Sequence, residues 1–159
     1  MRKIILSGML LLALGVMGCG GDDPADPSGG TPQGAGMSAK LDGASWTAVT
    51  AFAFRSGGLV AVGGSNTGGT NGIGFGFQDL GVGDYVIGPS STANGNVSDL
   101  AGNSWVASAD DGAGTISVTT LTASRIAGTF SFTAPRRLGS TGPEQRVVTE
   151  GVFDLAITP

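Results

Sequence analysis

The feature that most restricts how this chain can fold is an alternation of apolar and small polar side chains with a period of two residues. It is clearest in residues 125–134, where Thr, Ser and Ala separate the members of one alternate set, Ile126, Gly128, Phe130 and Phe132. Successive side chains of a β-strand point to opposite faces of a sheet, so the pattern predicts a half-buried strand. An amphipathic helix needs an apolar repeat of about 3.6 residues, and we find no convincing stripe of that kind.

The same alternation recurs along most of the chain, with short turn sequences between its copies. Residues 115–121 precede the strand just described by a three-residue link, which predicts a hairpin. Further strands are predicted at residues 39–41, 46–55, 59–64, 72–78, 84–87, 104–109 and 147–157. We therefore expect an all-β fold, in which an antiparallel meander of about eight or nine strands forms a sandwich or a partly closed barrel. The pattern does not choose between those two.

Composition supports this fold class. The chain has 30 Gly and only 13% charged residues, and Lys, Glu and Leu, which favour helices, are scarce. Glycine is concentrated in residues 72–77, where it alternates with Ile73, Phe75 and Phe77. A phosphate-binding loop would need a following helix, so we interpret this segment as a strand with one bare face. Alternatively, that bare face could form a flat, groove-like surface that binds a ligand.

The N-terminal residues indicate secretion. Arg2 and Lys3 precede an apolar run from Ile4 to Val16. This run is shorter than the roughly 20 apolar residues of a membrane-spanning helix. We therefore predict a signal peptide over residues 1–18.

The segment Val16-Met17-Gly18-Cys19 resembles the lipobox of bacterial lipoprotein precursors. The resemblance implies that a diacylglyceryl group is attached to the sulfur of Cys19, that cleavage precedes this residue, and that the new amino terminus is acylated. Two or three acyl chains hold a protein firmly in a membrane. Gly20 stands where an Asp would signal retention in the inner membrane, so the resemblance points to the outer membrane without indicating which face.

The remaining chain divides into a tether and a domain. Residues 19–36 contain Cys19 and a stretch rich in Gly, Pro and Asp, which predicts a flexible tether. Residues 37–159 are of ordinary size for a single domain. With six basic and nine acidic residues and no basic stripe, this domain is not expected to bind nucleic acid. We expect a monomer whose partners are the membrane, through Cys19, and an unidentified glycan, lipid or protein.

No group of residues predicts catalysis, a metal or a cofactor. The chain has no His, and no Ser stands in a nucleophile motif. The carboxylates from which a hydrolytic pair might be drawn are Asp84, Asp99, Glu144 and Glu150. Nothing in their spacing selects any two. The sequence Asp110-Asp111-Gly112 is interpreted as a solvated turn rather than a calcium site. Cys19, as the lipidation site, is the one predicted site residue.

The domain also resembles a known family. The segments that carry the resemblance are residues 38–43, 46–48, 114–118, 126–134 and 150–153. They are similar to a family of small β-rich lipoprotein domains of unknown function in Gram-negative bacteria. The resemblance implies a fold and a location in the cell envelope but no activity.

Two hypotheses on function follow. The favoured one is a non-enzymatic envelope module with a binding or structural role, and the alternative is a hydrolase of an envelope or extracellular polymer. An enzyme should have a cleft with convergent carboxylates, whereas a binding module should have an apolar or aromatic groove without them. A transport role would need an open interior, and a core filled by four aromatic residues would exclude it: Phe52, Phe75, Phe130 and Phe132.

Overall fold

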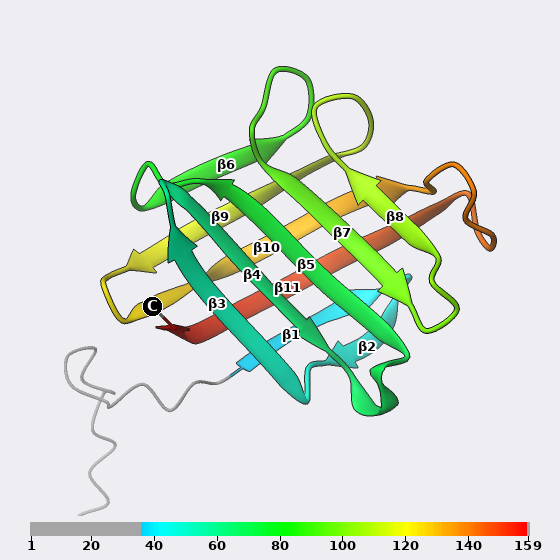
Figure 1. Ribbon diagram of the computed structural model, residues 1–159, viewed down its shortest axis with the longest axis horizontal. Coiled ribbons are helices and arrows are strands. Elements are labelled where there is room, and N and C mark those ends of the chain that lie inside the picture. The colour runs from blue at the N-terminus through cyan, green and yellow to red at the C-terminus, as the bar shows by residue number, and fades with distance from the viewer. Residues whose placement is uncertain (1–35, 159) are drawn as a thin grey trace, which may run out of the picture. The chain divides into compact units, whose positions relative to one another are not determined.

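The computed structural model describes residues 36–158 (Figure 1). Within this range the chain forms eleven β-strands, one short 3-10 turn at Thr67–Gly69 and no α-helix. The all-β prediction is confirmed.

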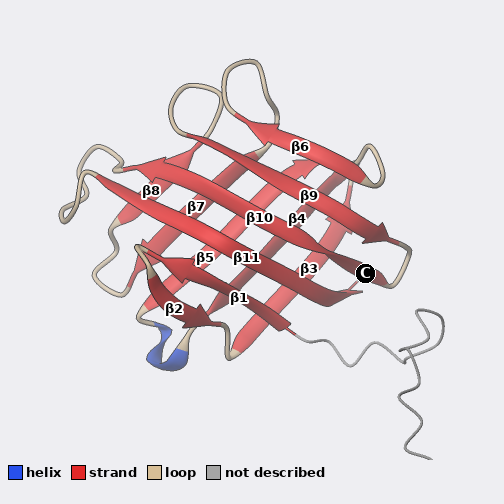
Figure 2. Cartoon of the chain, turned by 180° about the vertical axis from the view of Figure 1, so that it is seen from behind, coloured by secondary structure: helices blue, strands red, loops and turns tan. Residues whose placement is uncertain are grey.

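The strands form two layers that cross one another in the view of Figure 1. The layer called sheet A is seen from its outer side in Figure 2, and its strands pair in the order β6, β9, β10, β11, β1, β2. These strands are β6 (Gly83–Ile87), β9 (Ala113–Leu121), β10 (Arg125–Pro135), β11 (Gln145–Thr158), β1 (Gly36–Leu41) and β2 (Ala44–Thr47). The layer called sheet B contains, in pairing order, β3 (Thr50–Ser56), β4 (Leu59–Ser65), β5 (Asn71–Gln78), β7 (Asn94–Asp99) and β8 (Ser104–Ala107).

The two layers are joined at both sides, which gives a nearly closed, barrel-like fold. The end of β11 pairs in parallel with β3, with Ile157 opposite Ala53. On the other side, Trp105 of β8 forms a bridge with Arg136, which follows β10. The longest path of paired strands contains nine members, and β1 and β2 lie off this path.

Chain neighbours pair antiparallel in β3-β4-β5, in β7-β8 and in β9-β10-β11, as a meander predicts. The structure adds connections that the sequence pattern did not predict. Strand β5 pairs with β7 rather than β6, and β6 crosses to β9 in the other layer. Strand β7 was not predicted, because its Asn, Gly and Asp residues have low strand propensity.

The prediction of one continuous strand over residues 46–55 is wrong, and the difference changes which side chains are exposed on β3. It is two strands, β2 in sheet A and β3 in sheet B, separated by Ala48 and Val49. The break changes which alternate positions face inward, so Trp46 is buried and Phe52 is not. Ala53 takes the inward position on β3, where the parallel end of β11 lies alongside.

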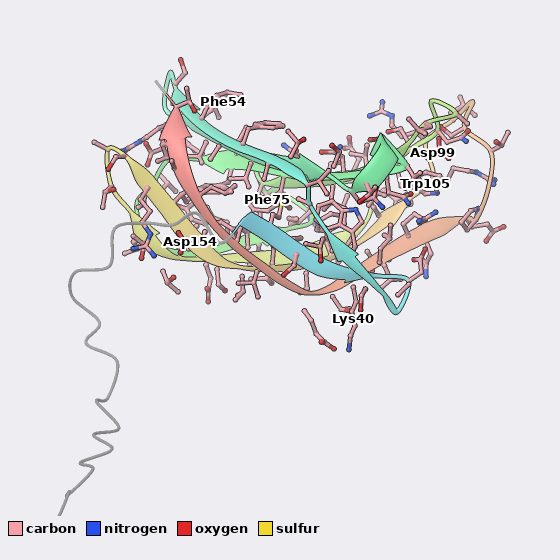
Figure 3. All side chains as sticks on the ribbon, turned by 90° about the horizontal axis from the view of Figure 1, so that it is seen from below. Lys40, Phe54, Phe75, Asp99, Trp105 and Asp154 are labelled. Carbon is pink, nitrogen blue, oxygen red and sulfur yellow. The ribbon has the colours of Figure 1, made fainter. Side chains whose placement is uncertain are left out.

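The interior is filled by aromatic side chains. The ring centroid of Phe75 lies 4.9 Å from that of Phe130 and 5.1 Å from that of Phe153. Figure 3 shows Phe75 between the two layers, and Phe132 is also buried. The expected aromatic core is therefore correct for three of its four members, and Phe52 is the exception. Packed rings thus occupy the space between the layers, whereas a transport role would need an open interior.

Candidate ligand-binding groove

The outer face of sheet B carries a repeated arrangement of side chains. One cross-strand row places Phe52, Gly63, Gly74 and Asn96 side by side on β3, β4, β5 and β7. The next row in the same register contains Phe54, Ala61, Gly76 and Asn94. Each row thus runs from an aromatic ring, across two small residues, to an amide. Together the rows form a groove with a volume of about 520 Å³, which lies within the usual range of ligand sites. We call it the sheet B groove.

The aromatic side of the groove is unusually exposed for rings of this size. Phe52 is 52% exposed and Phe54 is 46% exposed. Their ring planes are nearly parallel, at 13°, with centroids 6.4 Å apart. Figure 3 shows Phe54 on the layer formed by sheet B and away from Phe75 in the interior. An outer sheet face is commonly polar, so two adjacent exposed rings there indicate an interaction surface.

The floor of the groove is formed by Gly63, Gly74 and Gly76 of β4 and β5. Because glycine has no side chain, side chains from the neighbouring strands can extend over it. A Cβ atom on Gly63 would lie 2.8 Å from Cζ of Phe52, so this ring extends over Gly63. In the same way, a Cβ on Gly74 would lie 2.9 Å from Oδ1 of Asn96. Gly76 is different, since the nearest atom to its Cβ position is the Val60 carbonyl oxygen at 3.4 Å. A Cβ atom on Gly76 would therefore make only ordinary van der Waals contacts.

The polar side of the groove is formed by β7. Asn94, Asn96 and Ser98 occupy alternate positions and line the groove. Within residues 36–158 the two amide groups make no hydrogen bond to protein, and none of their polar atoms is buried without a partner. Each amide offers donors and acceptors. The groove thus has a row of hydrogen-bonding groups facing the aromatic pair.

The groove is electrically neutral. Its lining residues contain no Asp, Glu, Lys or Arg. The ion pairs of the described domain lie elsewhere: Lys40 with Glu150, Arg55 with Asp79, Arg125 with Asp154, and Arg146 with Asp42. A charged ligand would find no partner in the groove and would lose solvation on entering it.

The four carboxylates considered from the sequence are held separately, each on its own element. Asp84 on β6 accepts a hydrogen bond from Ser117 Oγ at 2.6 Å, and Glu150 on β11 accepts one from Lys40 Nζ at 2.7 Å. Asp99 ends β7, and Glu144 lies in the link between β10 and β11. None of the four lines the sheet B groove.

Two carboxylates have shifted pKa values for structural reasons. A side-chain hydrogen bond from Asn103 to Asp99, at 2.9 Å, lowers the pKa of that carboxyl below its ordinary value. Hydrogen bonds from the Arg125 guanidinium, at 2.7 and 2.8 Å, lower the pKa of Asp154. Both carboxylates are stabilised in the ionised form, which does not favour a general acid. No group of three or more His, Cys, Asp or Glu residues capable of holding a metal occurs in the described range.

Both tryptophans lie in the core. Trp46 and Trp105 are buried. The Trp105 indole N–H donates to the carbonyl oxygen of Pro143 at 2.9 Å, and the Arg146 guanidinium lies 5.0 Å from the indole ring centre. These contacts fasten the link between β10 and β11 to β8. Trp105 is thus a structural anchor of that link.

The predicted signal peptide, Cys19 and most of the predicted tether lie outside the described residues. Among residues 36–158, no helix has the length and apolar character that spanning a membrane requires.

The sequence indicated only part of the groove. The alternating glycines of β5 predicted a bare strand face, and that is where the floor lies. The aromatic wall was missed because β2 and β3 were joined in the prediction, which placed Phe52 in the core. The amide side was missed because β7 was not recognised. Alternation of Asn94, Asn96 and Ser98 around the buried Val97 was the available signal.

The fold defines the class of protein as a β-rich, barrel-like domain. The chain belongs to the family described as a domain of unknown function, DUF6252, whose model matches residues 33–155. The predicted resemblance to an uncharacterised family of β-rich domains is thereby confirmed, while the lipoprotein part stays a prediction. A search of curated proteins and a search of solved structures each found no match.

Proposed function

We propose that this protein is a lipid-anchored binding module of the bacterial envelope, and that the sheet B groove is its binding site. The observation that supports this most is the pairing of an exposed aromatic wall with unpaired amides across a bare floor. Rings and amides exposed in this way are ready to contact a ligand without rearrangement of the core. The absence of carboxylates from the lining favours binding over hydrolysis.

The proposed location at a membrane depends on the sequence alone. Acylation of Cys19 would fasten the domain to a membrane, with the outer membrane as the expected destination. The residues that follow Cys19 would space the domain from the lipid surface. A module of this kind needs no cofactor, metal or nucleic acid for its role.

Two experiments test the proposal. For the anchor, the natural host is fractionated and the N-terminal peptide is analysed by mass spectrometry. We expect Cys19 to carry lipid, and we expect Cys19→Ala to move the protein out of the membrane fraction. A free thiol on membrane-derived material would contradict the anchor.

For binding against hydrolysis, the purified chain is incubated with panels of glycans, phospholipids and peptides. Retention is measured on the immobilised protein, and the recovered compounds are analysed by mass. We expect at least one compound to be retained and recovered intact. Release of cleaved products would contradict the non-enzymatic role.

A further inference from the structure

The sheet B groove suits one class of ligand better than others. We infer that it binds a linear, uncharged oligosaccharide that lies along the strands and stacks on Phe52 and Phe54. This inference rests on the proposed function, since it specifies the ligand of the same groove.

The two sides of the groove match the two kinds of surface that a sugar ring presents. A pyranose has C–H groups on its faces and hydroxyl groups around its rim. The faces pack well against aromatic rings, and the hydroxyls can exchange hydrogen bonds with amides. Asn94 and Asn96 stand in the same cross-strand rows as Phe54 and Phe52. In the first row the Phe52 ring extends over Gly63 and Oδ1 of Asn96 extends over Gly74 on the next strand, so a sugar there would meet a ring and an amide together.

The repeat of the rows indicates a chain rather than a single sugar. Successive outward residues on a strand are about 6.6 Å apart, and the two ring centroids are separated by 6.4 Å. Two stacking positions therefore follow one another along β3. A monosaccharide can occupy one position, whereas an oligosaccharide can use both.

Other occupants fit less well. An acyl chain would leave the amides of Asn94 and Asn96 covered and unpaired, which is costly. An extended peptide usually binds a sheet by pairing with a strand edge. The floor strands β4 and β5 are paired on both sides, so they offer no free edge. An acidic glycan or a phospholipid headgroup would find no cation in the lining.

The test is isothermal titration of the purified chain with named probes. The neutral probes are cellohexaose, xylohexaose, mannohexaose, maltohexaose and hexa-N-acetylchitohexaose. The comparison probes are hexagalacturonic acid, oleate and an unstructured heptapeptide. We expect at least one neutral hexasaccharide to bind, and the corresponding monosaccharide to bind about tenfold more weakly or not at all. The acidic hexasaccharide, oleate and the peptide are expected not to bind.

Variants locate the site. Phe52→Ala and Asn96→Ala are each expected to weaken binding of the hexasaccharide by about tenfold or more. The matched controls are Val152→Ala, an exposed apolar residue on sheet A, and Gln145→Ala, an exposed amide at the start of β11. Both controls should bind like the parent. Circular dichroism and thermal melting establish that each variant is folded.

The outcomes separate the ligand class from the groove itself. If oleate or the peptide binds, Phe52→Ala weakens it and no neutral hexasaccharide binds, the oligosaccharide inference is wrong and the groove proposal stands. If a hexasaccharide binds and the groove variants bind it like the parent, the inference is wrong as to the site. Absence of binding by all five neutral probes also overturns it.

Discussion

Gly76 allows the floor of the groove to be tested separately from the fold. The substitution Gly76→Val would place a branched side chain on the outer face of β5, in the row that contains Phe54 and Asn94. Its Cβ would meet Val60 O at 3.4 Å and the Asn94 amide nitrogen at 3.6 Å, both ordinary contact distances. The backbone there is not in the left-handed region that favours glycine. The backbone conformation and the Cβ position at Gly76 therefore both admit a side chain.

The expected effect on stability is a gain. Glycine within a strand is less stable than alanine by about 0.5–1 kcal/mol, and valine has a still higher strand propensity. We expect Gly76→Val to raise the free energy of unfolding by about 1 kcal/mol, which corresponds to roughly 3–5 °C in Tm for a domain of this size. Urea denaturation followed by circular dichroism measures the change.

The expected effect on binding has the opposite sign. A valine side chain would rise from the floor between the aromatic and amide sides and would hold a ligand away from both. Affinity for the hexasaccharide should fall by about tenfold or more, equivalent to about 1.4 kcal/mol. Thr129→Val, on the exposed outer face of sheet A, is the control for an added apolar surface and should bind like the parent. A Gly76→Val protein that is destabilised by more than about 1 kcal/mol, or that binds unchanged, would refute this reasoning.

Three further predictions concern the fold. Gly128→Ala should destabilise the domain by about 2–3 kcal/mol, because its Cβ would clash with the Ser117 carbonyl oxygen and lie 2.9 Å from Cζ of Phe153; urea denaturation measures this, and a neutral result would contradict it. Trp105→Ala should cost about 3–5 kcal/mol and speed hydrogen exchange of residues 136–144, since the Trp105 indole holds Pro143; unchanged exchange would contradict the anchoring role. The unfolding free energy should fall as the pH is lowered from about 5 to 2, because the lowered pKa values of Asp99 and Asp154 mean that the unfolded chain binds more protons. Asp154→Asn should flatten that decline, and an unchanged slope in this variant would argue against the Arg125 contact as a source of it.

The strands with strong alternation could be predicted from the sequence because alternation is a local property. Strand β10 extends over Arg125–Pro135, close to the predicted range, and its inward residues Phe130 and Phe132 are buried. Their pairing partners are harder to predict, since pairing depends on contacts distant along the chain. The crossing of β6 to β9 and the parallel contact of β11 with β3 have no local signal.

A β-bulge in β11 also could not be predicted from alternation. In β11 the pairing register shifts around Glu150, which has a φ of 51°. Val148 rather than Val147 therefore lies with Phe153 on the buried face. A single added residue reverses the facing of all positions before it. Alternation alone does not locate such a shift.

The groove was difficult to predict for a related reason. Its aromatic wall depends on the break at Ala48 and Val49, and its amide side depends on pairing between β5 and β7. Residues of β3 and β7 meet on one face only after these long-range contacts form. The alternating glycines of β5 were the one local indication of the sheet B groove.

The most direct test of the groove as a binding site is a nuclear magnetic resonance titration. The purified, nitrogen-15-labelled chain is titrated with the tightest-binding neutral hexasaccharide, and shifts are followed for backbone amides and asparagine side chains. We predict that the largest shifts occur together at the side-chain amides of Asn94 and Asn96 and the backbone amides of Gly74 and Gly76. Shifts concentrated on the outer face of sheet A, around Thr129 and Ser131, would contradict the account.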